Sequence, residues 1–223
     1  MKNKLLILLC SIVLISCKKD ETSESVTVKY EVGDKFIYVM EQSYLYDDTT
    51  TTNLDSASLK YDTVITEVLK DTIINNYQCK VVSNLGWVGL NRIEYVTFLE
   101  DGYYYVASKS SDFEELQIYN PPIFQFPSNM KLGTHWGESP DDNTRRYEVV
   151  GQSSISNQVA KYNCVKIKYN VLSDDSFFRP DDQIFQYVSN KGLVKMEFSS
   201  SYSINSDEMH GKVYWSLKMN RVN

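Results

Sequence analysis

Residues 92–106 read Arg-Ile-Glu-Tyr-Val-Thr-Phe-Leu-Glu-Asp-Gly-Tyr-Tyr-Tyr-Val, and this stretch decides the fold class. A run rich in β-branched and aromatic residues, 92–99, leads to Asp101-Gly102, and a second such run follows. Asp-Gly between two runs of this kind is a strong hairpin signal, because both residues tolerate the backbone angles of a tight turn. The stretch therefore predicts two antiparallel strands joined by a short turn.

The rest of the chain repeats this pattern of strand candidates separated by turn residues. Asn75-Asn76 predicts a second tight turn, because asparagine tolerates positive φ. Residues 212–219 alternate strictly between polar and apolar side chains, and no segment of ten or more residues has a helical period. The sequence thus predicts an all-β fold. Further strands are expected at 35–46, 59–69, 78–83, 146–153, 161–171, 184–189 and 193–202.

Residues 112–130 interrupt this pattern of strand candidates separated by turns. Residues 113–119 favour a helical turn, and Pro121-Pro122 and Pro127 disfavour regular structure, because proline has no N–H to donate. We expect this segment to cross between two halves of the domain.

The two halves, about residues 31–111 and 131–219, resemble one another in three places, although β-hairpins of similar length also look alike by chance. A real duplication predicts one continuous antiparallel sheet, a sandwich or a half-barrel, with pseudo-twofold character. The matching segments are Val32-Gly33-Asp34-Lys35-Phe36 with Leu132-Gly133-Thr134-His135-Trp136, Tyr77-Gln78-Cys79 with Tyr162-Asn163-Cys164, and Tyr95-Val96 ahead of Gly102 with Tyr187-Val188 ahead of Gly192.

The N-terminus has the features of a secretory signal. Lysines at positions 2 and 4 precede the apolar run 5–15, which is shorter than the roughly 20 residues of a membrane-spanning helix. The run ends in Leu14-Ile15-Ser16-Cys17, which resembles a bacterial lipobox. This resemblance implies that residues 1–16 are removed and that Cys17 receives lipid, which would attach the protein to a membrane. An ordinary cleaved signal is the alternative.

The residues after Cys17 resemble a second targeting signal. Lys18-Lys19-Asp20-Glu21 resembles the charged tetrad behind the lipidated cysteine of Bacteroidota-type lipoproteins, in which a lysine before two acidic residues is associated with export to the outer surface of the outer membrane. Lys19, Asp20 and Glu21 are therefore the expected export signal, with a periplasmic orientation as the alternative. Residues 17–30 are mostly polar and predict a flexible tether, followed by one β domain over 31–223.

A further resemblance covers about residues 131–198, which are similar to a group of uncharacterised Bacteroidota lipoproteins. The pattern also resembles half-barrel proteins related to lipoprotein carriers of the LolA and LolB type, which implies a curved antiparallel sheet sheltering a hydrophobic cavity. Those carriers wrap the sheet around helices that this sequence does not show, and a fold alone does not confer function. The segments that carry the resemblance are Gly133-x-x-Trp136, Val149-Val150-Gly151, Tyr162-x-Cys164-x-Lys166, and Tyr187 followed by Gly192-Leu193-Val194-Lys195.

Composition and motifs exclude several classes of function. The net charge of −6 argues against nucleic acid as a partner. The chain has two histidines and shows no His-Glu-x-x-His, Gly-x-Ser-x-Gly or phosphate-binding glycine motif. We therefore expect no catalytic residue, no metal and no cofactor. Four aspartate pairs are expected in solvated loops, with calcium binding as the alternative. They begin at positions 47, 141, 174 and 181.

Two cysteines, Cys79 and Cys164, remain after the signal and the lipidated residue are set aside. An oxidising compartment permits a disulfide between them. Strand parity places Cys79 with apolar neighbours and Cys164 with Lys166 and Lys168. One cysteine is thus expected to be buried and the other to point outward, which disfavours the disulfide without excluding it.

These features together favour a non-enzymatic, lipid-anchored protein of the cell envelope. It would bind a hydrophobic or glycan ligand, or a partner protein. Its 17 tyrosines suit half-buried strands, with an aromatic ligand-binding face as the alternative. Two other functions stay open: an envelope-assembly component without a small ligand, and a hydrolase that uses loop carboxylates. A deep cavity in the fold would favour the binding function.

Overall fold

The structure is a computed structural model, and it describes residues 25–48, 54–87, 90–111, 115–137, 145–171, 182–205 and 210–223. The described residues form twelve strands: β1 (Lys35–Asp48), β2 (Leu54–Ile74), β3 (Tyr77–Trp87), β4 (Leu90–Phe98), β5 (Gly102–Ser110), β6 (Gln117–Pro127), β7 (His135–Gly137), β8 (Arg145–Ser156), β9 (Lys161–Val171), β10 (Gln183–Ser189), β11 (Gly192–Asn205) and β12 (His210–Arg221). No helix in these residues is long and apolar enough to cross a membrane.

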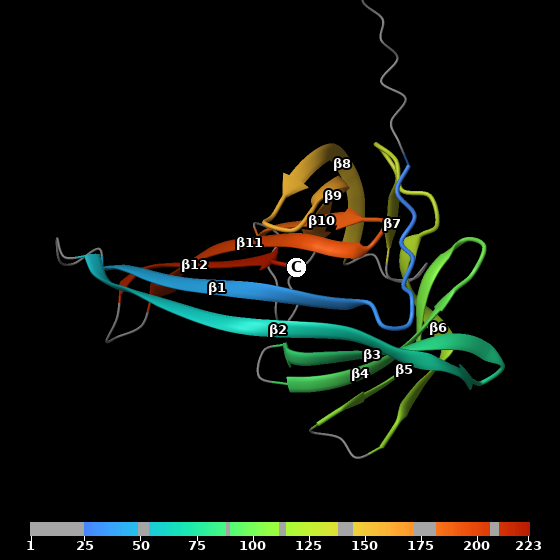
Figure 1. Cartoon of the computed structure of the whole chain (residues 1–223). Coiled ribbons are helices and arrows are strands. Elements are labelled where there is room, and N and C mark those ends of the chain that lie inside the picture. The colour runs from blue at the N-terminus through green and yellow to red at the C-terminus, as the bar shows by residue number, and fades with distance from the viewer. Residues whose placement is uncertain are drawn as a thin grey trace, which may run out of the picture.

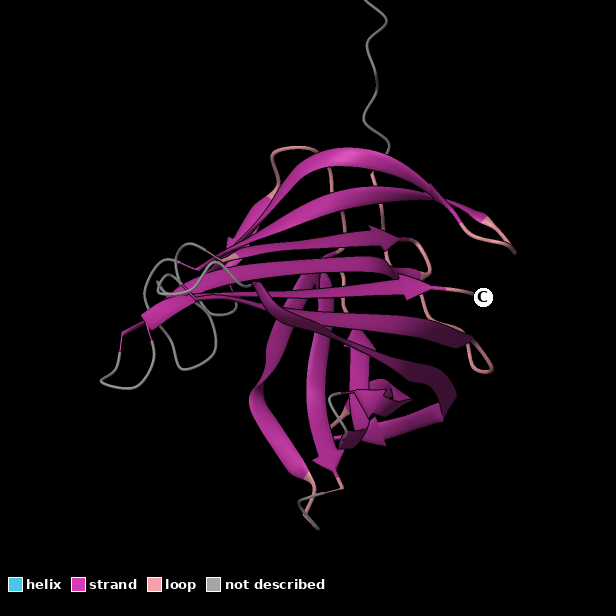
Figure 2. Cartoon of the chain, turned by 90° about the vertical axis from the view of Figure 1, so that its left-hand side faces the viewer, coloured by secondary structure: helices cyan, strands magenta, loops and turns pink. Residues whose placement is uncertain are grey.

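The strands form one antiparallel sheet in the order β6-β5-β4-β3-β2-β1-β12-β11-β10-β9-β8-β7. Each half of the chain is thus an up-and-down meander, and the two meanders join where the first strand pairs with the last (Figure 1). The sheet curls strongly about its own concave face (Figure 2). The prediction of an all-β half-barrel is confirmed, and the alternative of a two-sheet sandwich is wrong, because all the described strands belong to one sheet.

The segment between the halves differs from the prediction in detail. Residues 117–127, including the three prolines, form β6, so the helical turn is absent over 117–119. The expected break at Pro121-Pro122 is present as an interruption of the β5–β6 ladder, because residues 119–122 have no partner in register. Proline is tolerated here because β6 is an edge strand that pairs only with β5, with two shifts in register. The crossing to the opposite edge comes later, between Pro127 and His135.

The two halves begin with the same turn. In residues 31–34, the N–H of Gly33 donates to Val68 O and the N–H of Val68 donates to Asp34 O. In residues 131–134, the N–H of Gly133 donates to Val149 O and the N–H of Val149 donates to Thr134 O. Both glycines have φ between +80° and +95°, which the lack of a Cβ permits. The first of the sequence matches therefore corresponds to one repeated structure.

The halves also share two irregularities of the sheet. The β2–β3 register shifts after Val68, and the β8–β9 register shifts after Val149. The β4–β5 register shifts between Tyr95 and Val96, so that Val106 has no partner on β4. The β10–β11 register shifts between Tyr187 and Val188 in the same way, so that Val194 has no partner on β10. Shared bulges are what an internal duplication predicts, because a bulge is a specific local feature of a strand pair. When these shared bulges are taken as fixed points, the two halves can be aligned residue by residue.

The cysteines at corresponding positions are both buried and both free thiols. Cys79 and Cys164 are each 2% exposed. The prediction that Cys164 points outward is wrong, because aromatic side chains on its own face, Tyr162, Phe185 and Tyr187, cover it. The Nζ of Lys166 lies 3.9 Å from the centre of the Phe185 ring, so the lysine adds to this cover.

The segment before β1 is part of the core. Val26 forms an isolated antiparallel bridge with Met130, and Val28 is 5% exposed. Tyr30 packs against three separate clusters of the core, and its ring meets Phe98 edge-on at a centroid distance of 5.8 Å. Residues 25–30, predicted as tether, are therefore ordered against the domain, since their alternating side chains reach into the half-barrel.

Candidate functional site

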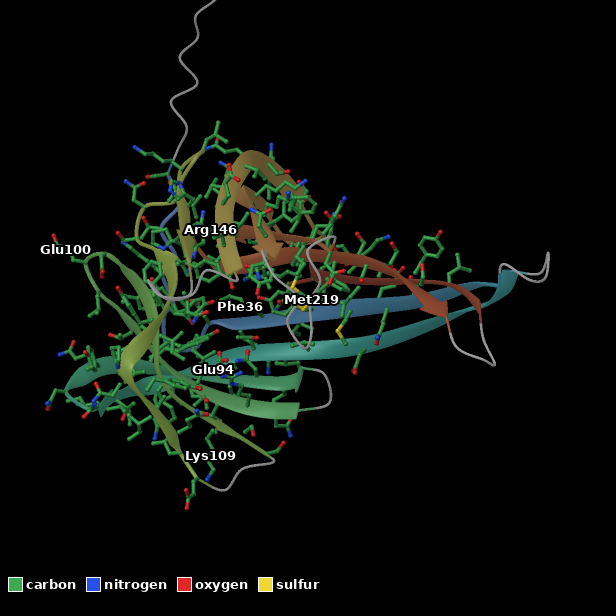
Figure 3. The ribbon with its side chains drawn as sticks, turned by 180° about the vertical axis from the view of Figure 1, so that it is seen from behind. Phe36, Glu94, Glu100, Lys109, Arg146 and Met219 are labelled. Atoms are coloured by element: carbon green, nitrogen blue, oxygen red, sulfur yellow. The ribbon has the colours of Figure 1, made fainter. Side chains whose placement is uncertain are left out.

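The concave face of the half-barrel encloses a cavity of about 300 Å³. Apolar and tyrosine side chains from both halves form most of its wall, and a cluster of polar side chains lies on β2–β5. Figure 3 shows Phe36, Glu94 and Met219 in the interior, whereas Glu100, Lys109 and Arg146 lie on the outside. The cavity is lined by Val28, Tyr30, Tyr38, Val64, Thr66, Val82, Asn84, Arg92, Glu94, Tyr103, Tyr105, Gln125, Phe126, Tyr147, Gln186, Val188, Gly192, Leu193, Met196 and Met219.

The polar wall is a hydrogen-bonded chain across neighbouring strands. The hydroxyl of Thr66 donates to Asn84 Oδ1 at 2.6 Å, and Asn84 Nδ2 donates to Glu94 Oε2 at 3.0 Å. Arg92 Nε lies 3.3 Å from the other oxygen, Glu94 Oε1. The Tyr105 hydroxyl is close enough to interact with the Glu94 carboxyl, and it helps to lower the pKa of that carboxyl. The carboxyl group therefore accepts a hydrogen bond from Asn84 and has Arg92 as its ion-pair partner, which is how a buried charge is stabilised.

The electrostatics of this wall follow from its burial. Glu94 is 8% exposed, and burial raises the pKa of its carboxyl, an effect opposed by Arg92 and by the hydrogen bond from Asn84. Burial also raises the pKa of the Tyr103 and Tyr105 hydroxyls far above the ordinary tyrosine range. Both tyrosines are thus neutral and present O–H groups to the interior.

The opposite wall carries the counterpart of Glu94. Gln186 precedes Tyr187-Val188 as Glu94 precedes Tyr95-Val96, at the corresponding bulge. Its neighbours in register are Ile167 on β9 and Met196 on β11. Gln186 Oε1 is buried and, in the part of the chain that the structure describes, accepts no hydrogen bond. The wall of the second half is therefore mostly apolar, with the polar groups of Tyr147 and Gln186, and Gln186 Oε1 is a buried acceptor without a partner.

A second cavity of about 390 Å³ lies beneath residues 27–31, beside the β4–β5 hairpin and the end of β6. Val28, Tyr30, Tyr103 and Phe126 line both cavities. The Tyr30 hydroxyl reaches Gly192, where an added Cβ would lie 2.7 Å from it. Gly192 thus gives room for the Tyr30 ring, which lines both cavities and packs against core clusters of both halves.

The sequence did not single out these cavity residues. Its lipidation and export residues, from Leu14 to Glu21, lie outside the described residues. His135 is exposed at the start of β7, and within the described residues no three or more His, Cys, Asp or Glu side chains gather. One signal for the cavity was present: Arg92 and Glu94 share a strand face with Val96 and Phe98, which places two charges on an otherwise apolar face.

No protein-family model and no curated protein sequence matches this chain. Two solved structures are similar to it. One, from Bacteroides fragilis, is described as an exported protein with a YmcC-like fold; it is 12% identical, covers 86% of this chain and 97% of its own, and gives a TM-score of 0.36. The other is a DUF1329 family protein from Desulfovibrio piger, which is 9% identical. The match covers 90% of this chain and 85% of the other protein, with a TM-score of 0.19. Neither likeness says what this chain does.

Proposed function

We propose that this protein is a lipid-anchored component of the cell envelope that binds a small ligand in its central cavity and performs no catalysis. The observation that carries the proposal is the cavity itself, which is concave, mostly apolar and supplied with a few convergent polar groups. This combination is the usual form of a small-molecule site, although about 300 Å³ lies at the lower end of the range.

A binding role fits the chemistry of the wall better than hydrolysis does. Among the described residues that line the cavity, Glu94 is the one carboxylate, and it already accepts a hydrogen bond from Asn84 and pairs with Arg92. Glycoside hydrolysis ordinarily needs two carboxyl groups facing one bond. The network instead holds Glu94 in place, as a binding wall requires.

The anchor is the second part of the proposal. The lipobox-like sequence ends at Cys17, and the residues that the structure describes begin at Ser25, eight residues later. Eight residues reach at most about 28 Å, so a lipid on Cys17 would hold the domain close to a membrane. The expected location is the outer membrane, facing the cell surface. Replacing Cys17 by Ser should release the protein into the soluble fraction, whereas continued retention in the membrane would contradict the anchor.

Native mass spectrometry tests the ligand. The mature protein is extracted from its own membrane and cleaved within the tether, so that only molecules held by the domain are counted. We expect a reproducible added mass of lipid or sugar size. Val64→Phe, which fills the cavity, should lose this mass, and Val39→Phe, on the exposed face of β1, should keep it. A bare domain mass from wild-type protein would overturn the binding function.

A further inference from the structure

Among the described residues that line the cavity, Gln186 is the one with a fully buried side-chain oxygen that has no hydrogen-bond partner. The polar groups of the facing wall satisfy one another: Thr66 with Asn84, Asn84 with Glu94, and Glu94 with Arg92. Gln186 Oε1 is buried between apolar neighbours and accepts from no described residue. A buried acceptor without a donor is unfavourable, and folded proteins rarely keep one without a reason.

The comparison of the two halves sharpens this point. Gln186 and Glu94 occupy corresponding positions, yet Glu94 pairs with Val82 and Ser108 in register while Gln186 pairs with Ile167 and Met196. The position that corresponds to Asn84 in the other half holds Tyr169, which follows Ile167 by two residues as Asn84 follows Val82. The Asn84 amide thus has no equivalent beside Gln186, and no described residue donates to Gln186 Oε1.

Charge limits what the cavity can accept. Arg92 and Glu94 are the charged side chains among the described residues of its wall, and their 3.3 Å contact makes the pair neutral. A ligand that brought a charge into this space would be buried without a counter-charge, which is strongly unfavourable. An uncharged ligand avoids this cost.

We infer that the central cavity selects an uncharged amphiphile whose hydroxyl or amide N–H group donates a hydrogen bond to Gln186 Oε1 while its apolar part lies against Val188, Met196 and Met219. This inference rests on the proposed binding function and names the ligand class. Alkyl glycosides and other hydroxyl-bearing amphiphiles belong to it, whereas fatty-acid anions and alkylammonium ions do not.

The test compares three probes with the same six-carbon chain: hexyl β-D-glucoside, hexanoate and hexylammonium. Each is titrated by calorimetry at neutral pH into the whole mature chain, residues 17–223, carrying Cys17→Ser so that no lipid competes. We expect the glucoside to bind at least tenfold more tightly than either charged probe, because it alone carries uncharged donors.

The variant that isolates the hydrogen bond is Gln186→Met, which keeps the length of the side chain and removes the carbonyl. We expect it to weaken hexyl glucoside at least fivefold and to change the two charged probes less than twofold. Gln183→Met, on the same strand at an exposed position, is the matched control and should change nothing. Gln186→Leu replaces the first variant if its circular dichroism spectrum differs from wild type.

Two outcomes separate this inference from the function on which it rests. A native adduct in the mass spectrum, with equal affinity for all three probes or no effect of either Gln186 variant, overturns the ligand class and leaves the binding function standing. In that case Gln186 is satisfied by water. Failure of every probe together with a bare domain mass overturns both proposals.

Discussion

The two halves of the half-barrel share a plan and differ in what they place on the concave face. Strands β1–β6 present Thr66, Asn84, Glu94 and Arg92 to the interior, and these side chains form a connected polar chain. Strands β7–β12 present Tyr147, Val188 and Met196, with Gln186 as the exception. A repeated backbone therefore supports two different walls, because side chains can diverge where register and bulges are kept.

The halves also meet in two different ways. At one junction β1 and β12 form a regular ladder from Tyr38–Arg221 to Asp48–Gly211. At the corresponding junction, between β6 and β7, a side chain makes the contact: Trp136 Nε1 donates to Gln125 O at 2.8 Å. One junction is thus a paired sheet, and the other is an opening spanned by an aromatic ring. This difference makes the molecule a half-barrel.

Removal of the Tyr30 side chain should have the largest effect, because this residue contacts core clusters of both halves. Tyr30→Ala is expected to lower the free energy of unfolding by about 3 kcal/mol, the lower end of the range for a large aromatic residue of the core, because Tyr30 is partly buried. Tyr214→Ala, at a position 39% exposed, should change it by less than about 0.5 kcal/mol. Urea denaturation measures both. Equal effects would show that Tyr30 does not join the halves.

The contact across the open junction should matter less. Trp136→Phe keeps the ring near Tyr147, whose ring it stacks on at 5.3 Å, and removes the N–H that donates to Gln125 O. We expect a loss of about 1 kcal/mol and faster hydrogen exchange in β6 and β7. Ser43→Ala removes a side-chain contact across the β1–β12 ladder and is the control. Unchanged exchange at β6 and β7 would mean that Trp136 does not hold the junction.

The polar wall should make stability depend on pH through Glu94. Because burial raises the pKa of this carboxyl in the folded state, its protonated form favours folding. Its contribution is present below the ordinary glutamate pKa and is lost as pH rises through the raised value. The stability of wild type relative to Glu94→Gln should therefore fall as pH rises from the ordinary glutamate pKa through the raised value of the folded state. Glu100→Gln, at the exposed hairpin tip, should follow wild type. A constant or rising difference would contradict the prediction.

The two cysteines, which are buried at corresponding positions of the two halves, should show the smallest effect: almost no chemical modification in the folded protein. Burial raises the pKa of the Cys164 thiol to about 11 and raises that of Cys79 as well. Iodoacetamide at pH 8 should therefore modify neither residue in the folded protein and both in urea, because the reactive thiolate is scarce and covered. Mass spectrometry counts the added groups. Rapid modification of Cys164 alone would show that its half opens.

Local chemistry explains what the sequence could predict of the fold. Asn75 and Asn76 have φ values of 49° and 68°, as the predicted turn requires, and the Asp-Gly hairpin joins β4 to β5. These features depend on a few adjacent residues. Pro121-Pro122 interrupt the ladder with β5, as predicted, but β6 continues on both sides of them. An edge strand tolerates such an interruption, and whether a strand lies at an edge depends on distant parts of the chain.

The candidate site was less accessible to sequence reasoning. Alternation shows that Arg92 and Glu94 share a face with Val96. The hydrogen bonds that link Thr66, Asn84 and Glu94, however, exist only because β2, β3 and β4 pair in one register. The same holds for Gln186, whose isolation results from the residues that β9 and β11 place beside it. A shift of one residue in either ladder would change every neighbour.

The sequence by itself therefore determined the all-β class, the turns and the positions of most strands, because a two-residue period and turn-forming residues act over short distances. Only the tertiary structure decided which faces are covered. Parity correctly grouped Cys164 with Lys166, yet aromatic side chains on neighbouring strands bury that face. Likewise, Tyr30 follows a polar segment but lies in the core. Burial depends on what the curved sheet brings together, and pairing across the length of the chain sets that curvature.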